Sequence, residues 1–136
     1  MANNYCEFSA LLEIPKDKLE KLEDLLEKII SQIVSEEEYL ECEAEIDSSG
    51  IWFHSIDGSG QPEHVERIAR YVIQNLGIYK QFICSYAYYC SKLRLDEFGG
   101  GAFLIEINKP TIWIEPVIEA RKKASRRNKR QSKKYE

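Results

Sequence analysis

The chain has 136 residues, of which 43% are apolar and 31% charged, so it is long enough to bury one core and too apolar to be disordered throughout. Residues 1–115 hold 10 Lys/Arg against 21 Asp/Glu, a net charge of −11, whereas residues 116–136 hold 9 against 2, a net charge of +7. No apolar run approaches the roughly 18 residues of a membrane span, and the first residues lack the basic and apolar stretches of a signal peptide. We expect a cytoplasmic protein with one domain over 1–117 and a basic helix or tail over 118–136.

The first half of the chain predicts a strand, a helix and a hairpin. Residues 5–14 alternate as a strand, and a helix follows up to about Val34 with one apolar stripe. Residues 40–47 alternate apolar side chains with acids, and a tight turn returns the chain as a strand over 51–56. The inward-facing residues of the helix are Leu19, Leu22, Leu26, Ile29 and Ile33, and the acids of the next strand are Glu41, Glu43, Glu45 and Asp47.

The second half predicts another helix and three more strands. Pro62 begins this helix, where its missing N–H costs nothing, and Gly77 is placed to end it in a left-handed cap. Strands follow over about 79–91, 102–107 and 111–115, with a turn that contains the three glycines before the second of them.

The order β-α-β-β-α-β, followed by two more strands, matches the plan of ferredoxin-like domains. The sequence therefore predicts an α+β fold with an antiparallel sheet and two helices on one face. The second strand would lie at one edge, and a C-terminal β-hairpin would extend the sheet at the other. Because acids on an edge strand block pairing with another chain, the acidic row over 40–47 suits that edge better than it suits a cation site.

The four cysteines, Cys6, Cys42, Cys84 and Cys90, each fall in an apolar or alternating stretch, and none forms a C-x-x-C pair. Disulfide frameworks of secreted proteins are usually denser and lie in loops. We therefore expect buried free thiols.

Residues 90–101 gather charges of both signs before three consecutive glycines, Gly99, Gly100 and Gly101. Glycine in such a place permits positive φ, a bulge, or the close approach of a ligand or another backbone. One interpretation is an anion or carboxylate site made by Lys92, Arg94 and free glycine N–H groups. The other, favoured because no helix begins after the glycines, is a bulged turn with solvated or self-paired charges.

The same segment contains the string S-K-x-R-x-x-E-F-G-G-G, formed by Ser91, Lys92, Arg94, Glu97, Phe98, Gly99, Gly100 and Gly101. This string resembles a motif of small uncharacterised bacterial proteins that are similar to cargo of phages and integrated mobile elements. The resemblance covers only this string and a similar order of elements. It implies an accessory protein of a mobile element and brings no activity or active site.

Catalysis and metal binding find little support in the sequence. Lys92 near Cys90 is of the kind that activates a thiol, but nothing marks a paired base, and no nucleophile elbow is present. His54 and His64 lack the further ligands that a metal site needs. We predict no catalytic residue, no metal, no cofactor and no enzymatic activity.

Aromatic residues are concentrated on the predicted sheet. Tyr86, Tyr88 and Phe82 share one face of the fourth strand. If the face opposite the helices is exposed, such aromatics mark a partner surface or a dimer interface. RNA-binding sheets with stacking aromatics have the same topology, but a body of charge −11 repels phosphates, which favours a protein partner or a second copy.

The basic tail has two interpretations that stay open. It is either a solvated terminus that folds against the chain's own acids, or a sequence-independent contact with nucleic acid or an acidic protein. The residues that would make this contact are Arg121, Lys122, Lys123, Arg126, Arg127, Lys129 and Arg130.

The sequence thus predicts a protein-interaction module of a phage or mobile element, acting through its aromatic sheet face and the glycine segment, without a membrane partner. Two alternatives remain: a nucleic-acid-associated protein anchored by its tail, and a binder of a small anion at the glycine-rich turn.

Overall fold

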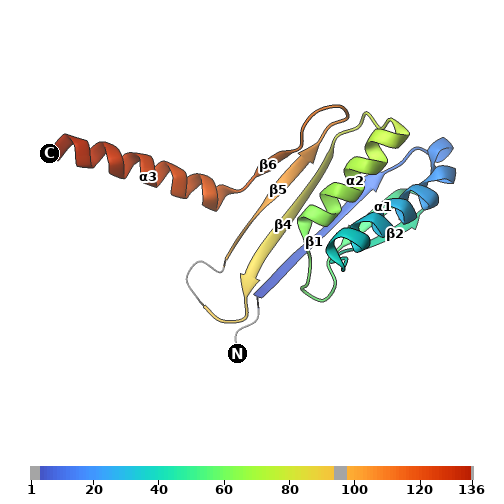
Figure 1. Ribbon diagram of the computed structural model, residues 1–136, viewed down its shortest axis with the longest axis horizontal. Coiled ribbons are helices and arrows are strands. Elements are labelled where there is room, and N and C mark those ends of the chain that lie inside the picture. The colour runs from blue at the N-terminus through green and yellow to red at the C-terminus, as the bar shows by residue number, and fades with distance from the viewer. Residues whose placement is uncertain (1–3, 94–97, 136) are drawn as a thin grey trace.

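The computed structural model describes residues 4–93 and 98–135, which form a six-stranded antiparallel sheet and three α-helices (Figure 1). The strands are β1 (Asn4–Glu13), β2 (Glu43–Asp47), β3 (Gly50–His54), β4 (Phe82–Cys90), β5 (Gly99–Ile105) and β6 (Ile112–Ile114). The helices are α1 (Leu22–Glu37), α2 (Pro62–Leu76) and α3 (Pro116–Tyr135), and a 3₁₀ turn, η1 (Lys16–Lys21), precedes α1.

The strand order across the sheet is β2-β3-β1-β4-β5-β6, and each neighbouring pair is antiparallel. β3 lies between the two strands that α1 connects, and β1 lies between the two strands that α2 connects. The predicted α+β class is confirmed. β2 lies at one edge, and β5 and β6 extend the sheet beyond β4 at the other.

The core lies between the sheet and two helices, α1 and α2, which pack on the same face (Figure 1). Alternate residues of β1, including Phe8 and Leu12, point into this core, as the period of two requires. The predicted stripe of the first helix is buried, apart from Leu19, which is half-buried, and α2 buries a stripe that includes Val65, Ile68 and Val72. Gly77 ends α2 with φ +66°, in the left-handed cap that its position predicted.

His64 is the buried polar residue of the described part of the chain, with 1% of its side chain exposed. Its Nδ1 accepts the backbone N–H of Glu41 at 3.0 Å, so the proton is on Nε2, which donates to the Glu37 carboxylate at 3.0 Å. These bonds connect α2 with the end of α1 and with the segment before β2. His64 therefore has a structural role.

The structure differs from the prediction at the starts of β4 and β5. The glycines do not form a turn but begin β5, where Gly99, Gly100 and Gly101 pair with β4. β4 itself begins at Phe82 rather than near residue 79. The C-terminal segment, expected to be a basic helix or tail over 118–136, forms the helix α3.

Candidate functional site

Tyr86 and Tyr88 were predicted to belong to an exposed aromatic surface opposite the helices. They lie instead on the face of the sheet that carries α1 and α2. They alternate along β4 with exposed residues and share the face of Phe82, whose ring is in the core. Tyr86 is only 5% exposed, and its hydroxyl donates to Glu115 Oε1 at 2.8 Å. The prediction fails because the period of two ties both tyrosines to the helix-bearing face.

The glycines at the start of β5 make room for this tyrosine. Gly101 pairs with Tyr86, and a Cβ at Gly101 would lie 2.2 Å from the carbonyl oxygen of Ile114 and 3.0 Å from the Tyr86 hydroxyl. Gly100 has φ +142°, and a Cβ there would lie 2.4 Å from the backbone oxygen of Tyr86. Burial and the hydrogen bond to Glu115 raise the pKa of Tyr86 well above its ordinary value, so the hydroxyl remains a donor.

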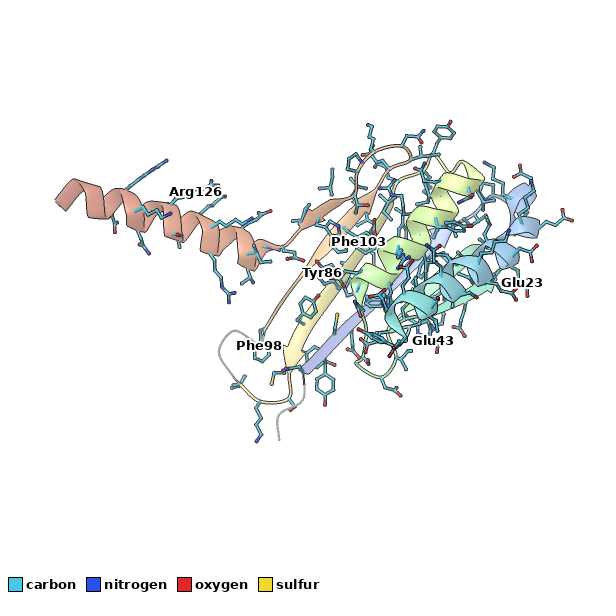
Figure 2. All side chains as sticks on the ribbon, viewed as in Figure 1. Glu23, Glu43, Tyr86, Phe98, Phe103 and Arg126 are labelled. Carbon is cyan, nitrogen blue, oxygen red and sulfur yellow. The ribbon has the colours of Figure 1, made fainter. Side chains whose placement is uncertain are left out.

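The glycines of the predicted anion site therefore lie in a strand and not in a turn. Sheet pairing with β4 engages the backbone of this segment. Lys92 is exposed after β4, and Phe98 is 45% exposed just before β5 (Figure 2). Arg94 and Glu97, the other charged members of the predicted site, lie outside the described residues.

The face of the sheet opposite α1 and α2, here called the open face, is not covered by any helix of the described chain (Figure 1). A continuous row of apolar side chains crosses it. Trp52 pairs with Leu11, Ile83 pairs with Leu104, and Leu104 pairs with Ile112. Leu11 and Ile83 line one cavity between β1 and β4, so the two halves of the row lie on either side of this cavity.

The side chains of this apolar row are unusually accessible. Ile83 is 63% exposed, and Trp52, Leu11 and Ile112 are between 42% and 51% exposed. The Trp52 ring is held in place because its Nε1 donates to Ser9 Oγ at 2.8 Å. A connected exposed apolar surface of this kind is typical of an interaction site.

Small residues form a shallow depression beside the apolar row. Ser9, Ser55, Ser85 and Ala87 line it together with Glu7, and its volume is about 450 Å³. Acids also lie on the open face, along β1 and β2. Those on β1 alternate with core-facing residues, and those on β2 pair with open-face residues such as Trp52. These acids are Glu7, Glu13, Glu43, Glu45 and Asp47.

The two edges of the sheet differ in chemistry. β2 carries acids along one edge, whereas β6 consists of Ile112, Trp113 and Ile114, all exposed by more than a third. The Trp113 ring covers Phe103, with ring centroids 4.9 Å apart. An uncharged edge is open to pairing with another chain.

α3 leaves the sheet directly after β6 and projects away from the body (Figure 1). All of its described side chains are exposed, and Arg126 points into solvent (Figure 2). The basic residues predicted for nucleic-acid contact all lie on this helix; they are Arg121, Lys122, Lys123, Arg126, Arg127, Lys129 and Arg130.

The four cysteines are buried free thiols, as predicted. Burial raises the pKa of Cys6 to about 11 and the pKa of Cys42 and Cys84 to about 12. These three thiols are protonated at neutral pH and are poor nucleophiles. The described residues contain no group of three or more side chains that could hold a metal ion.

Comparison with known proteins gives no match: no family model, no curated protein and no solved structure is significantly similar to the chain. Within residues 4–93 and 98–135, no helix is both long and apolar enough to cross a membrane.

Sequence reasoning missed the apolar row, although a signal for it was present. Leu11, Trp52 and Ile83 are large apolar residues at strand positions out of phase with the core. Such residues belong to the face that an ordinary two-layer fold leaves to water. Their alignment into one row depended on the strand register.

Proposed function

We propose that the chain is a non-enzymatic protein-interaction module that binds a protein partner through its open face. The observation that carries the proposal is the apolar row, which crosses the sheet from Trp52 to Ile112 without a cover. Burying such side chains is favourable by about 25 cal/mol per Å² of apolar surface. The adjoining depression of small residues leaves space for an element of the partner.

The class of fold is part of the proposal. Each crossover through α1 and α2 is split by one intervening strand, which supports a ferredoxin-like unit extended by β5 and β6. The four free thiols suit a reducing compartment such as the cytoplasm. The string around Phe98 supports an accessory role in a phage or mobile element.

A photo-crosslinking experiment tests the open face. Benzoylphenylalanine replaces Ile83 in one full-length variant and Val34 in the matched control, because Val34 is 42% exposed on the outer side of α1. Both positions are exposed, and circular dichroism checks that each variant folds. Irradiation in the cells that make the protein should give a discrete adduct from position 83 and none from position 34. Equal adducts, or none from either position, would overturn the proposal.

A second candidate function follows from α3. A projecting helix whose described basic side chains are all exposed suits sequence-independent contact with phosphates. Fluorescence anisotropy with a DNA duplex compares the full chain with residues 1–115. Binding that requires α3 and weakens steeply between 50 and 200 mM salt, by about 10³-fold or more for several phosphate contacts, supports this function. Equal affinity of the two chains excludes α3 as the anchor.

A further inference from the structure

We propose that the partner on the open face is a second copy of this chain, and that each copy lays its α3 across the open face of the other. This inference rests on the proposed function and names the occupant of the same surface. It requires that α3 need a partner, that the open face suit it, and that α3 not reach the open face of its own chain.

α3 is poorly suited to stand alone. Isolated helices are marginal in water even for favourable sequences. Cations four residues apart repel along this helix, for example Lys122 with Arg126 and Arg126 with Arg130. All of its described side chains are exposed, so no core packing offsets that repulsion. A surface that neutralises these cations would stabilise the helix.

One stripe of α3 is nevertheless free of charge. Its members recur at spacings of three and four residues, which is the pattern of a contact face on a helix. They are Val117, Ala120, Ala124, Asn128 and Gln131. Most of these side chains are small, so the helix backbone can approach a flat surface closely.

The open face is complementary to that stripe and to the cations that flank it. The depression lined by Ser9, Ser85 and Ala87 accepts a helix with a small-residue face. Glu7 lines the depression, and further acids on β1 and β2, including Glu43, match the basic flanks. At 1.5 Å per residue α3 is about 30 Å long, and six strands about 4.8 Å apart span about 24 Å, so the helix crosses the whole sheet.

The start of α3 is held on the helix-bearing face of the sheet, so α3 does not reach the open face of its own chain. Glu115 is held by Tyr86 on the helix-bearing face, and a Cβ on Gly99 would lie 3.7 Å from Val117 Cγ2, so the first turn adjoins β5 on that face. Figure 2 shows Arg126 outside the body, at the opposite side of the molecule from Glu43. Docking between two copies leaves these contacts intact, whereas docking within one copy breaks them.

The exchange is symmetric, since each copy supplies one helix and one open face. β6, the uncharged edge from which α3 departs, faces the second copy in this arrangement. Charge reversal tests this contact, because the acids of the open face and the cations of α3 can be reversed in separate variants.

Three full-length variants are compared with the wild-type chain by sedimentation velocity at 50 and 500 mM salt. The face variant carries Glu43→Lys and Glu45→Lys, and the helix variant carries Lys122→Glu, Arg126→Glu and Arg130→Glu. The control, Glu20→Lys with Glu23→Lys, makes the same charge change on exposed residues of η1 and α1. Circular dichroism confirms that each variant is folded.

The wild type and the control should form dimers that weaken with salt, while the face and helix variants alone should associate at least about tenfold more weakly. An equimolar mixture of the face and helix variants should regain the dimer, since the helix of each then opposes a face of opposite charge. Docking within one copy predicts no such rescue.

A monomeric wild type at 50 mM salt, a helix variant that dimerises as well as the wild type, or a mixture that stays monomeric would each overturn the inference. A monomer that binds a DNA duplex through α3, with the face variant binding equally well, would show that phosphates are the occupant of α3. Crosslinking at Ile83 separates this failure from that of the proposed function. An adduct with another protein preserves the proposed function while a second copy is ruled out, and no adduct at all ends both.

Discussion

The two faces of the sheet are built by the same strands but are related to water in opposite ways. On the helix-bearing face, Ile51, Phe53 and Ile105 are fully buried against α1 and α2. On the open face, their immediate neighbours Trp52 and Leu104 belong to an apolar row that is largely exposed. Similar residue types therefore serve stability on one face and, in our proposal, recognition on the other.

This difference shows that apolar content alone does not distinguish core from interface. What distinguishes them is the cover, which α1 and α2 provide on one side only (Figure 1). Substitutions on the covered face should act mainly on the free energy of unfolding, and those on the open face mainly on association. Unfolding is measured under conditions where the chain is monomeric.

The largest effect is expected for a fully buried isoleucine. Ile105→Ala creates a cavity beneath α2 and should lower the free energy of unfolding by about 2–5 kcal/mol. Ile83→Ala, on the neighbouring strand but 63% exposed, should lower it by about 1 kcal/mol or less. Urea denaturation measures both. Equal losses would mean that the two faces do not differ in burial as described.

The two histidines provide the second comparison. His64→Ala leaves the N–H of Glu41 and the carboxylate of Glu37 without their partner and opens a cavity, so we expect a loss of about 2–4 kcal/mol. His54 is half-buried and bonds the exposed Glu45 at 3.0 Å. His54→Ala should therefore cost about 1 kcal/mol or less. Thermal unfolding of the two variants provides the measurement, and a larger loss for His54→Ala would contradict it.

The glycines of β5 provide the third comparison. Gly101→Ala places a Cβ 2.2 Å from the backbone oxygen of Ile114, so β6 must shift, at a cost of about 1–3 kcal/mol. Gly99→Ala meets only an ordinary contact, 3.7 Å from Val117, and should change stability by about 1 kcal/mol or less in either direction. The denaturant midpoints of both variants measure these changes in stability. An unchanged stability of Gly101→Ala would contradict the close approach of β6 to Gly101.

The smallest effect is a loss of stability at alkaline pH. Cys42 and Cys84 have folded pKa values of about 12, against 9.0 for an ordinary thiol, so the unfolded chain releases their protons first. Their contribution is complete below pH 9 and is lost as pH rises from 9 towards 12, by about 1 kcal/mol per thiol at pH 9.5. Denaturation at pH 7.5 and 9.5 should show this loss, and the double change Cys42→Val, Cys84→Val should reduce it. An unchanged pH dependence in the double variant would contradict the assignment.

Local patterns in the sequence determined most of the architecture. The apolar stripe predicted α1, Pro62 and Gly77 predicted the two ends of α2, and the alternation and turn signals predicted β1, β2, β3 and β6 close to their observed bounds. These features depend on periodicity and cap geometry, which act over a few residues. The placement of β2 at an edge was also readable, because its acids suit no buried position.

Only the tertiary structure decided which residues of different strands are neighbours. Strand register paired Trp52 with Leu11, and the packing of β1 beside β4 placed Leu11 and Ile83 at one cavity. Register also paired Tyr86 with Gly101, so the glycines that were predicted to form a turn belong to β5. Neither result follows from a local pattern, since both depend on pairs of residues far apart in the chain. The sequence thus determined which face of each element is apolar, whereas the packing of α1 and α2 decided which apolar face is left for a partner.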